Sequence, residues 1–230
     1  MEVLVVRKPI KNLHLAVLPP NGMIRVSSPV HLNDDAIRTL IATRIPWIRK
    51  QRTKFEGQAR QTPREYVSGE SHYVLGKPHR LEVVWEERPA TVRVVGKNRM
   101  ILQVRPKSGV ARREDVVMAW YRNELRGIVD ELLRIWQDRI GVAVDGWAIK
   151  RMKTRWGTCN QKARRIWLNL ELVKKPMACI EYVVVHELMH LLEKKHNERF
   201  VALMTQHLPK WRSCKEELNR FMLAHEEWSY

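Results

Sequence analysis

The sequence has few cysteines and no long apolar run. Its three cysteines, Cys159, Cys179 and Cys214, are too few and too scattered for a disulfide framework, and no Cys-x-x-Cys pair is present. No apolar run approaches the ~20 residues that span a bilayer, and the apolar residues 3–6 are too short a run for a signal peptide. We therefore expect a protein of a reducing compartment, located in the cytoplasm, without a membrane partner.

Acidic residues are scarce relative to basic ones. The 230-residue chain holds 42 Lys and Arg against 25 Asp and Glu, a formal net charge of +17, and its 44% of hydrophobic residues excludes wholesale disorder. Nine basic residues and one acidic residue fall within residues 150–175. This charge favours polyanionic partners such as nucleic acid or nucleotides, and the alternative interpretation is a solvated basic face.

The hydrophobic pattern changes near residue 110. Up to that point, short alternating segments predict strands, with one helix over residues 35–54 in which Pro46 predicts a kink. The predicted strands cover residues 13–17, 23–26, 66–84, 91–95 and 101–104. We therefore predict a β-rich N-terminal region over residues 1–110.

Beyond residue 110 the periodicity is mainly helical. The predicted elements are a helix over residues 114–140 that Gly141 ends, strands over 150–159 and 165–172, a helix over 176–190 and a helix from residue 209. The last helix is expected to bury Trp211, Leu218, Phe221 and Met222. The sequence thus predicts an α+β fold in which residues 111–230 form the catalytic domain.

The candidate chemistry lies in the segment His186-Glu187-Leu188-Met189-His190. On a helix, residues four apart differ by about 40° in azimuth and about 6 Å in height, so two imidazoles at this spacing can bind one ion. A catalytic zinc takes three protein ligands and a water, and the adjacent Glu187 can act as a general base toward that water. The alternative is a pair of core histidines, which is disfavoured because buried polar groups need partners.

A third ligand must come from elsewhere in the chain. His196 follows His190 by six residues, which in an unbroken helix would place it about 240° round the axis, so the helix must end first. No glycine or proline lies between them, although Lys194 and Lys195 suit a helix C-terminus. We expect His196 to be the ligand. The alternatives are Glu198, His207, Glu216 and Glu217.

Several segments resemble the YgjP-like metallopeptidase family, which is related to the SprT-like zinc metalloproteases. They are Arg155-Trp156-Gly157-Thr158-Cys159, Ile166-Trp167-Leu168-Asn169, the segment from Tyr182 to His190, His196 with Phe200, and two N-terminal segments at residues 66–70 and 75–78. The resemblance implies zinc ligands at His186, His190 and His196 and a catalytic acid/base at Glu187. It also implies a zincin-like catalytic half with a small antiparallel sheet and an active-site helix.

Two departures from known patterns accompany this resemblance. The family commonly has Ser after the third histidine, where this chain has Asn197, and we expect little effect from that change. The histidine spacing also equals that of metzincins, but Glu193 stands where their turn glycine would be, so the metzincin resemblance is weaker.

The two predicted strands before the active-site helix suggest where a substrate binds. An edge strand can bind an extended peptide through main-chain hydrogen bonds, and Trp156, Trp167 and Arg155 could line such a groove. Alternatively, both tryptophans pack the strands against the helix. Arg155 or Tyr182 could stabilise an oxyanion. Cys159 is expected to be a small buried residue.

The sequence therefore predicts a zinc-dependent hydrolase, most readily a metallopeptidase acting on polypeptides through a zinc-activated water and Glu187. A metal-dependent nucleotide phosphoanhydride hydrolase is an alternative, because the basic residues 150–175 could hold phosphates, although no Gly-rich phosphate loop is present. A further alternative is a basic nucleic-acid-binding protein with a structural zinc. That site would be expected to close with a fourth ligand, usually Cys.

Overall fold

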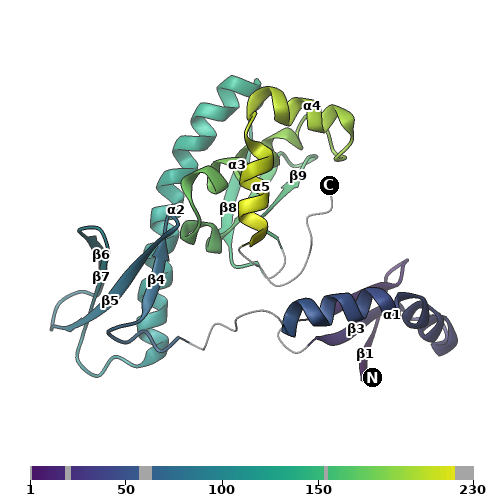
Figure 1. The fold of residues 1–230 in the computed structure, drawn as a ribbon, viewed down its shortest axis with the longest axis horizontal. Helices are drawn as coiled ribbons and strands as arrows, with labels where there is room; N and C mark the ends of the chain where they lie inside the picture. The colour runs from purple at the N-terminus through teal and green to yellow at the C-terminus, as the bar shows by residue number, and fades with distance from the viewer. Residues whose placement is uncertain (1, 19–21, 57–63, 153–154, 221–230) are drawn as a thin grey trace. The chain divides into compact units, whose positions relative to one another are not determined.

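The structure of the protein is a computed structural model that describes residues 2–18, 22–56, 64–152 and 155–220. The chain divides into two compact units, residues 1–62 and residues 63–222, and each is described by itself. The mixture of small sheets and helices confirms the predicted α+β class (Figure 1). Among the described residues, no helix has both the length and the apolar character to cross a membrane.

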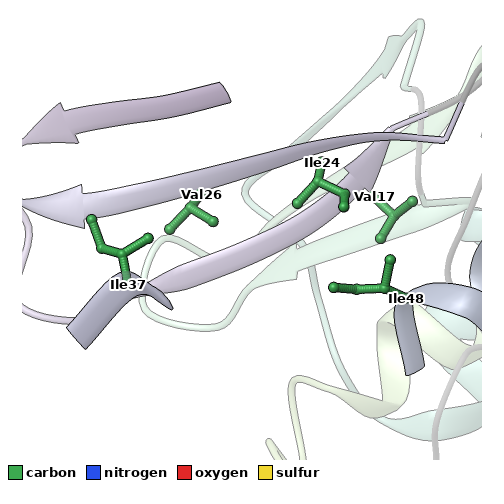
Figure 2. Packing of buried hydrophobic residues seen from close by; sticks show 5 residues of the cluster. All are labelled: Val17, Ile24, Val26, Ile37 and Ile48. Carbon is green, nitrogen blue, oxygen red and sulfur yellow. The ribbon is translucent and has the colours of Figure 1, made fainter. Parts of the chain in front are cut away.

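The N-terminal unit is a three-stranded sheet with one helix. Strand β3 (Met23–Pro29) is central, with β2 (His14–Leu18) antiparallel on one side and β1 (Val3–Lys8) parallel on the other. Helix α1 (Asp34–Glu56) continues through Pro46. The core of the unit joins the sheet to the helix through Val17, Ile24, Val26, Ile37 and Ile48 (Figure 2).

The second unit begins with a four-stranded sheet of order β4-β5-β7-β6. Its strands are β4 (Ser71–Val74), β5 (Lys77–Trp85), β6 (Thr91–Val95) and β7 (Arg99–Val104). The long helix α2 (Val110–Ile140) packs on β6 and β7 and also contacts the elements that follow (Figure 1). Gly141 ends α2 in the left-handed conformation, φ 74°, as the sequence predicts, and its N–H donates to the Gln137 carbonyl.

A second, smaller sheet and three helices complete this unit. The strands are β8 (Gly146–Lys150), β9 (Gly157–Asn160) and β10 (Arg165–Asn169), followed by the 3-10 helix η1 (Leu170–Lys174) and helices α3 (Met177–Met189), α4 (Glu198–His207) and α5 (Trp211–Arg220). The sheet has the order β8-β10-β9, with β8 parallel and β9 antiparallel to β10. It is therefore mixed rather than antiparallel as predicted, because the segment predicted as one strand over residues 150–159 contributes the end of β8 and most of β9. Phe221 and Met222, predicted to be buried on the last helix, lie outside the described residues.

The unit boundary falls near residue 62, whereas we expected a change near residue 110. Hydrogen bonds from the β4–β5 hairpin to η1 explain why the four-stranded sheet belongs to the same unit as the later elements. At the β4–β5 turn, the Leu75 and Gly76 N–H groups donate to the carbonyls of Val173 and Lys174 in η1, at 2.8 and 3.2 Å. A Cβ on Gly76 would lie 2.8 Å from the Pro176 Cγ, so the close approach requires glycine here.

Candidate metal centre

Helix α3 is almost wholly buried. Each residue from Tyr182 to Met189 is buried, including His186 at 1% exposure and Glu187 at 2%. A buried helix of this kind holds its side chains in fixed positions, which a preorganised site requires.

The helix ends at His190 without a glycine or proline. His190 keeps a right-handed backbone, and the chain leaves through short turns in which the Leu191 and Leu192 N–H groups donate to the Leu188 and Met189 carbonyls. The His190 Nδ1–H donates to the Glu193 carbonyl at 3.1 Å. This bond closes the turn that brings His196 back, and it leaves the His190 Nε2 lone pair for another partner.

Three imidazoles meet at this turn. The His196 Nε2 lies 3.2 Å from the His186 Nε2 and 3.0 Å from the His190 Nε2, and the ligand atoms of the group all lie within 4.8 Å of one another. Nitrogen ligands of a tetrahedral zinc lie about 2.0–2.1 Å from the ion and hence ~3.3 Å apart. The cluster thus fits one small ion. Among the residues that the structure describes, no further histidine, cysteine or carboxylate joins the group, which leaves out the alternatives Glu198, His207, Glu216 and Glu217.

Aromatic residues pack around the cluster. Phe200, from the first turn of α4, has its ring centroid 4.7–4.9 Å from those of all three histidines. The Tyr182 ring contacts His186 edge-on at 5.8 Å and stacks on Trp211 of α5 at 6.4 Å. Packing from both sides restricts the imidazole orientations.

The environment keeps the imidazoles neutral, which is the form that binds metal. Burial, followed by the neighbouring His190 and His196, lowers the pKa of His186 well below its usual value. Burial, with His190 and Lys215, lowers the pKa of His196 to about 4. Burial also lowers the pKa of His190.

Glu187 directly follows His186 on α3 and is buried inside the unit. Its Oε2 is buried and has no hydrogen-bond partner among the described residues. Burial raises the pKa of Glu187 to about 8, and the nearby Arg155 partly offsets this rise. A buried carboxyl with an unused oxygen normally marks a ligand or a catalytic group.

The loop between β8 and β9 is held by Asn169, a role that the sequence analysis missed. The fully buried Asn169 amide donates to the carbonyls of Met152 and Arg155, both at 2.8 Å, and its oxygen accepts from the Met152 N–H at 3.3 Å. The Asn169 N–H also donates to the Trp156 carbonyl at 2.8 Å. The only signal in the sequence is a polar residue at the end of an apolar strand.

A comparison with protein families shows which family the chain belongs to. Residues 11–221 match the YgjP-like, metallopeptidase domain family, which is nearly the whole chain. The chain is a member of the YgjP-like metallopeptidase family. Among curated proteins, no sequence matches the chain.

Two solved structures are similar to part of this YgjP-like chain. One is the metallopeptidase zymogen abylysin of Pyrococcus abyssi, with 19% identity and a TM-score of 0.38 over 41% of this chain and 94% of that chain. The other is the metallopeptidase zymogen jannalysin of Methanocaldococcus jannaschii, with 24% identity and a TM-score of 0.34 over 42% of this chain and 92% of that chain.

The departure at Asn197 has a structural explanation in this YgjP-like chain. Asn197 is the N-cap of α4, and its side-chain oxygen accepts from the Phe200 N–H at 3.1 Å. Asn and Ser are about equally good N-caps, so either residue can start the helix directly after His196.

The tryptophans expected to line a groove differ in exposure. Trp156 is buried at 3% exposure, with the Lys175 Nζ 5.5 Å from its ring centroid, so it packs the unit rather than lining a groove. Trp167 is half-buried beneath the Lys150 Nζ at 4.6 Å. Cys159, expected to be buried, is partly exposed.

Several of the basic residues in 150–175 already form ion pairs within the protein. Arg151 pairs with Glu114 at 3.1 Å, and Arg164 pairs with Asp145 and donates to the Ala143 carbonyl. Lys174 pairs with Glu171, and Lys153 lies outside the described residues. Arg155, Lys162 and Arg165 are exposed, and they form the part of this stretch best placed to meet an anion.

Proposed function

We propose that this chain is a zinc metallopeptidase in which His186, His190 and His196 hold the ion and Glu187 is the general acid/base. One observation carries the proposal: the three imidazoles of His186, His190 and His196 form one cluster, and Glu187, the residue after His186 on α3, has a buried carboxyl oxygen without a partner among the described residues. When bound there, zinc would lower the pKa of a water to about 7 and would polarise the substrate carbonyl.

The protein's own residues then divide the remaining work. Glu187 would take a proton from the attacking water and return it to the leaving amine, because its Oε2 has no hydrogen-bond partner among the described residues. The positive charge of a bound ion would oppose the effect of burial and favour the ionised carboxylate that this role needs. The Glu193 carbonyl holds the His190 ring in the tautomer that presents Nε2. Burial of α3 excludes bulk water from the carboxyl.

The position of β9 next to α3 also supports a polypeptide substrate. Strand β9 is an outer strand of its sheet and contacts α3, so an extended peptide can add along it by main-chain hydrogen bonds. We assign oxyanion stabilisation to Arg155, which is exposed and acts electrostatically on Glu187, whereas Tyr182 is fully buried.

A purely structural zinc is less well supported. Such sites close with a fourth protein ligand, usually a thiolate, but no thiol joins the histidines in the described part of the chain. Cys179 donates instead to the Cys214 carbonyl, 3.8 Å away, between α3 and α5.

The test is turnover by the zinc-loaded protein on unfolded polypeptides and on nucleoside triphosphates, measured side by side. The matched control is Glu187→Gln, which keeps the size of the side chain but removes the base. We expect polypeptide cleavage by the wild type and far less by the variant. Triphosphate hydrolysis that depends on Glu187 would reassign the chain to phosphoanhydride chemistry, and no turnover on either panel would refute the hydrolase.

A further inference from the structure

The first residue of β9, Gly157, is in close contact with Glu187. A Cβ at Gly157 would lie 2.6 Å from the Glu187 Oε1, 2.8 Å from Cγ and 2.9 Å from Cδ. Outside their own residue and its two chain neighbours, real Cβ atoms essentially never lie within 3.0 Å of a heavy atom, and here the three nearest such atoms all belong to Glu187. Any larger residue at this position would therefore displace the carboxyl.

The backbone does not itself require glycine here. The φ angle of Gly157 lies outside the left-handed range that favours glycine, unlike those of Gly76 and Gly141. The close approach of the strand to Glu187 remains as the reason for a glycine at this position.

The strand cannot easily retreat from Glu187. Gly157 pairs with Leu168 in the antiparallel ladder of β9 and β10. The two preceding carbonyls, of Arg155 and Trp156, accept hydrogen bonds at 2.8 Å from the buried Asn169. An added methyl group would therefore move the end of the Glu187 side chain rather than the strand.

We propose that Gly157 is a positioning residue, which lets β9 close against Glu187 and so fixes the carboxyl relative to the three imidazoles. The inference rests on the proposed role of Glu187 as acid/base. Small displacements of a catalytic group cost rate, about 10²-fold for ~1 Å, without requiring any loss of fold.

Gly157→Ala tests this role, and Gly146→Ala is the matched control. Gly146 begins β8 of the same sheet, and a Cβ there would lie 3.5 Å from the Arg165 Nε, an ordinary contact. We expect both variants to bind zinc within about twofold of the wild-type affinity. Gly157→Ala should lower kcat for a polypeptide by about 10–100-fold with KM little changed, whereas Gly146→Ala should leave both nearly unchanged.

A double-variant comparison tests whether the effect passes through Glu187. In a Glu187→Gln background, adding Gly157→Ala should cause no further loss of kcat, because the group being positioned has already been removed. In zinc-free protein, Gly157→Ala should lower the melting temperature less in a Glu187→Ala background than in the wild type, because the shorter side chain leaves room for the methyl group.

The outcomes separate this inference from the proposed function. If zinc-loaded wild type cleaves polypeptides and Gly157→Ala keeps the kcat of Gly146→Ala, the positioning role is refuted while the function stands. Loss of zinc affinity in Gly157→Ala, or equal melting shifts in both backgrounds, would also refute it. If the wild type cleaves nothing, the proposed function fails, and the melting comparison still decides whether Gly157 fixes the carboxyl.

Discussion

Two groups in the same unit, His72 alone and the cluster of His186, His190 and His196, differ in what faces their ring nitrogens. His72 is 1% exposed, with Nε2 3.2 Å from the Glu70 Oε2 and Nδ1 3.4 Å from the Tyr121 hydroxyl oxygen. His186 is equally buried, but its Nε2 faces the Nε2 of His196 at 3.2 Å. His72 is held between a carboxylate and a hydroxyl, whereas His186 directs its Nε2 toward the point where the Nε2 atoms of the three clustered histidines meet.

Neither burial nor pKa distinguishes these two groups. Burial lowers the pKa of His72 to about 4, and it lowers the pKa of His196 to the same value. Perturbed pKa values occur in structural networks as well as in functional sites. The atoms that face the ring nitrogens distinguish the candidate metal site from His72, and the following predictions test this distinction and its consequences.

The largest effect is expected from Glu187→Gln. The substitution keeps the side-chain size and removes the proton acceptor, so hydrolysis should fall about 10²–10⁴-fold. Zinc content and the circular dichroism spectrum should match the wild type. An unchanged rate would show that Glu187 takes no part in the chemistry or that the activity belongs to a contaminant.

The next largest effect separates the two histidine groups directly. His196→Ala removes a proposed ligand, so zinc affinity should fall by more than the 10–100-fold typical of outer-shell changes. His72→Gln should leave zinc affinity unchanged and lower the free energy of unfolding instead. Competition with a chromophoric chelator measures both affinities. Wild-type zinc affinity in His196→Ala would place the third ligand elsewhere.

A third prediction concerns the pH dependence of stability. His72 has a folded pKa of about 4 against an ordinary 6.5, so the unfolded chain takes up the proton first as pH falls. Its contribution to stability should be complete above about pH 6.5, fall between that pH and about 4, and be reduced by about 2 kcal/mol at pH 5. The Glu70 carboxyl, whose pKa is lowered, adds a loss of the same sign at lower pH.

Urea unfolding of zinc-free protein at pH 7 and pH 5 measures this loss. The metal-site histidines titrate in the same direction, so the comparison is between wild type and His72→Gln, which has no imidazole at this position. Between pH 7 and pH 5, the free energy of unfolding should fall by about 2 kcal/mol less in His72→Gln than in the wild type. An equal loss in the free energy of unfolding for the two proteins would contradict a buried neutral His72.

The smallest effect is expected at the helix cap beside His196. Asn197→Ala removes the acceptor for the Phe200 N–H and should lower the free energy of unfolding by about 1 kcal/mol. Asn197→Ser should cost much less, because Ser is also a good N-cap. Thermal unfolding of both variants checks this, and an equal loss in the two would show that the cap is unimportant.

The parts of the fold with local signals were predictable. The 3.6-residue period predicted α2, Pro176 marked the start of α3, and Gly141 ends α2 as expected. The parallel pairing of β1 with β3, and that of β8 with β10, was not visible, because strands distant in sequence give no local sign of their partners.

The meeting of the three histidines could be predicted from the sequence, but the contacts that support the cluster could not. The spacing of His186 and His190 follows from helix geometry, whereas the turn toward His196 depends on a side-chain bond to the Glu193 carbonyl. The contact of Gly157 with Glu187, and the hold of Asn169 on its loop, join segments that only the folded chain brings together.

X-ray absorption at the zinc K-edge of the metal-loaded protein tests the central claim most directly. We predict one zinc per chain with three imidazole nitrogens and one oxygen at about 2.0–2.1 Å and no sulfur. In His196→Ala the imidazole count should fall. A sulfur scatterer near 2.3 Å would indicate a cysteine-closed structural site, and failure to bind zinc at all would refute the metal centre.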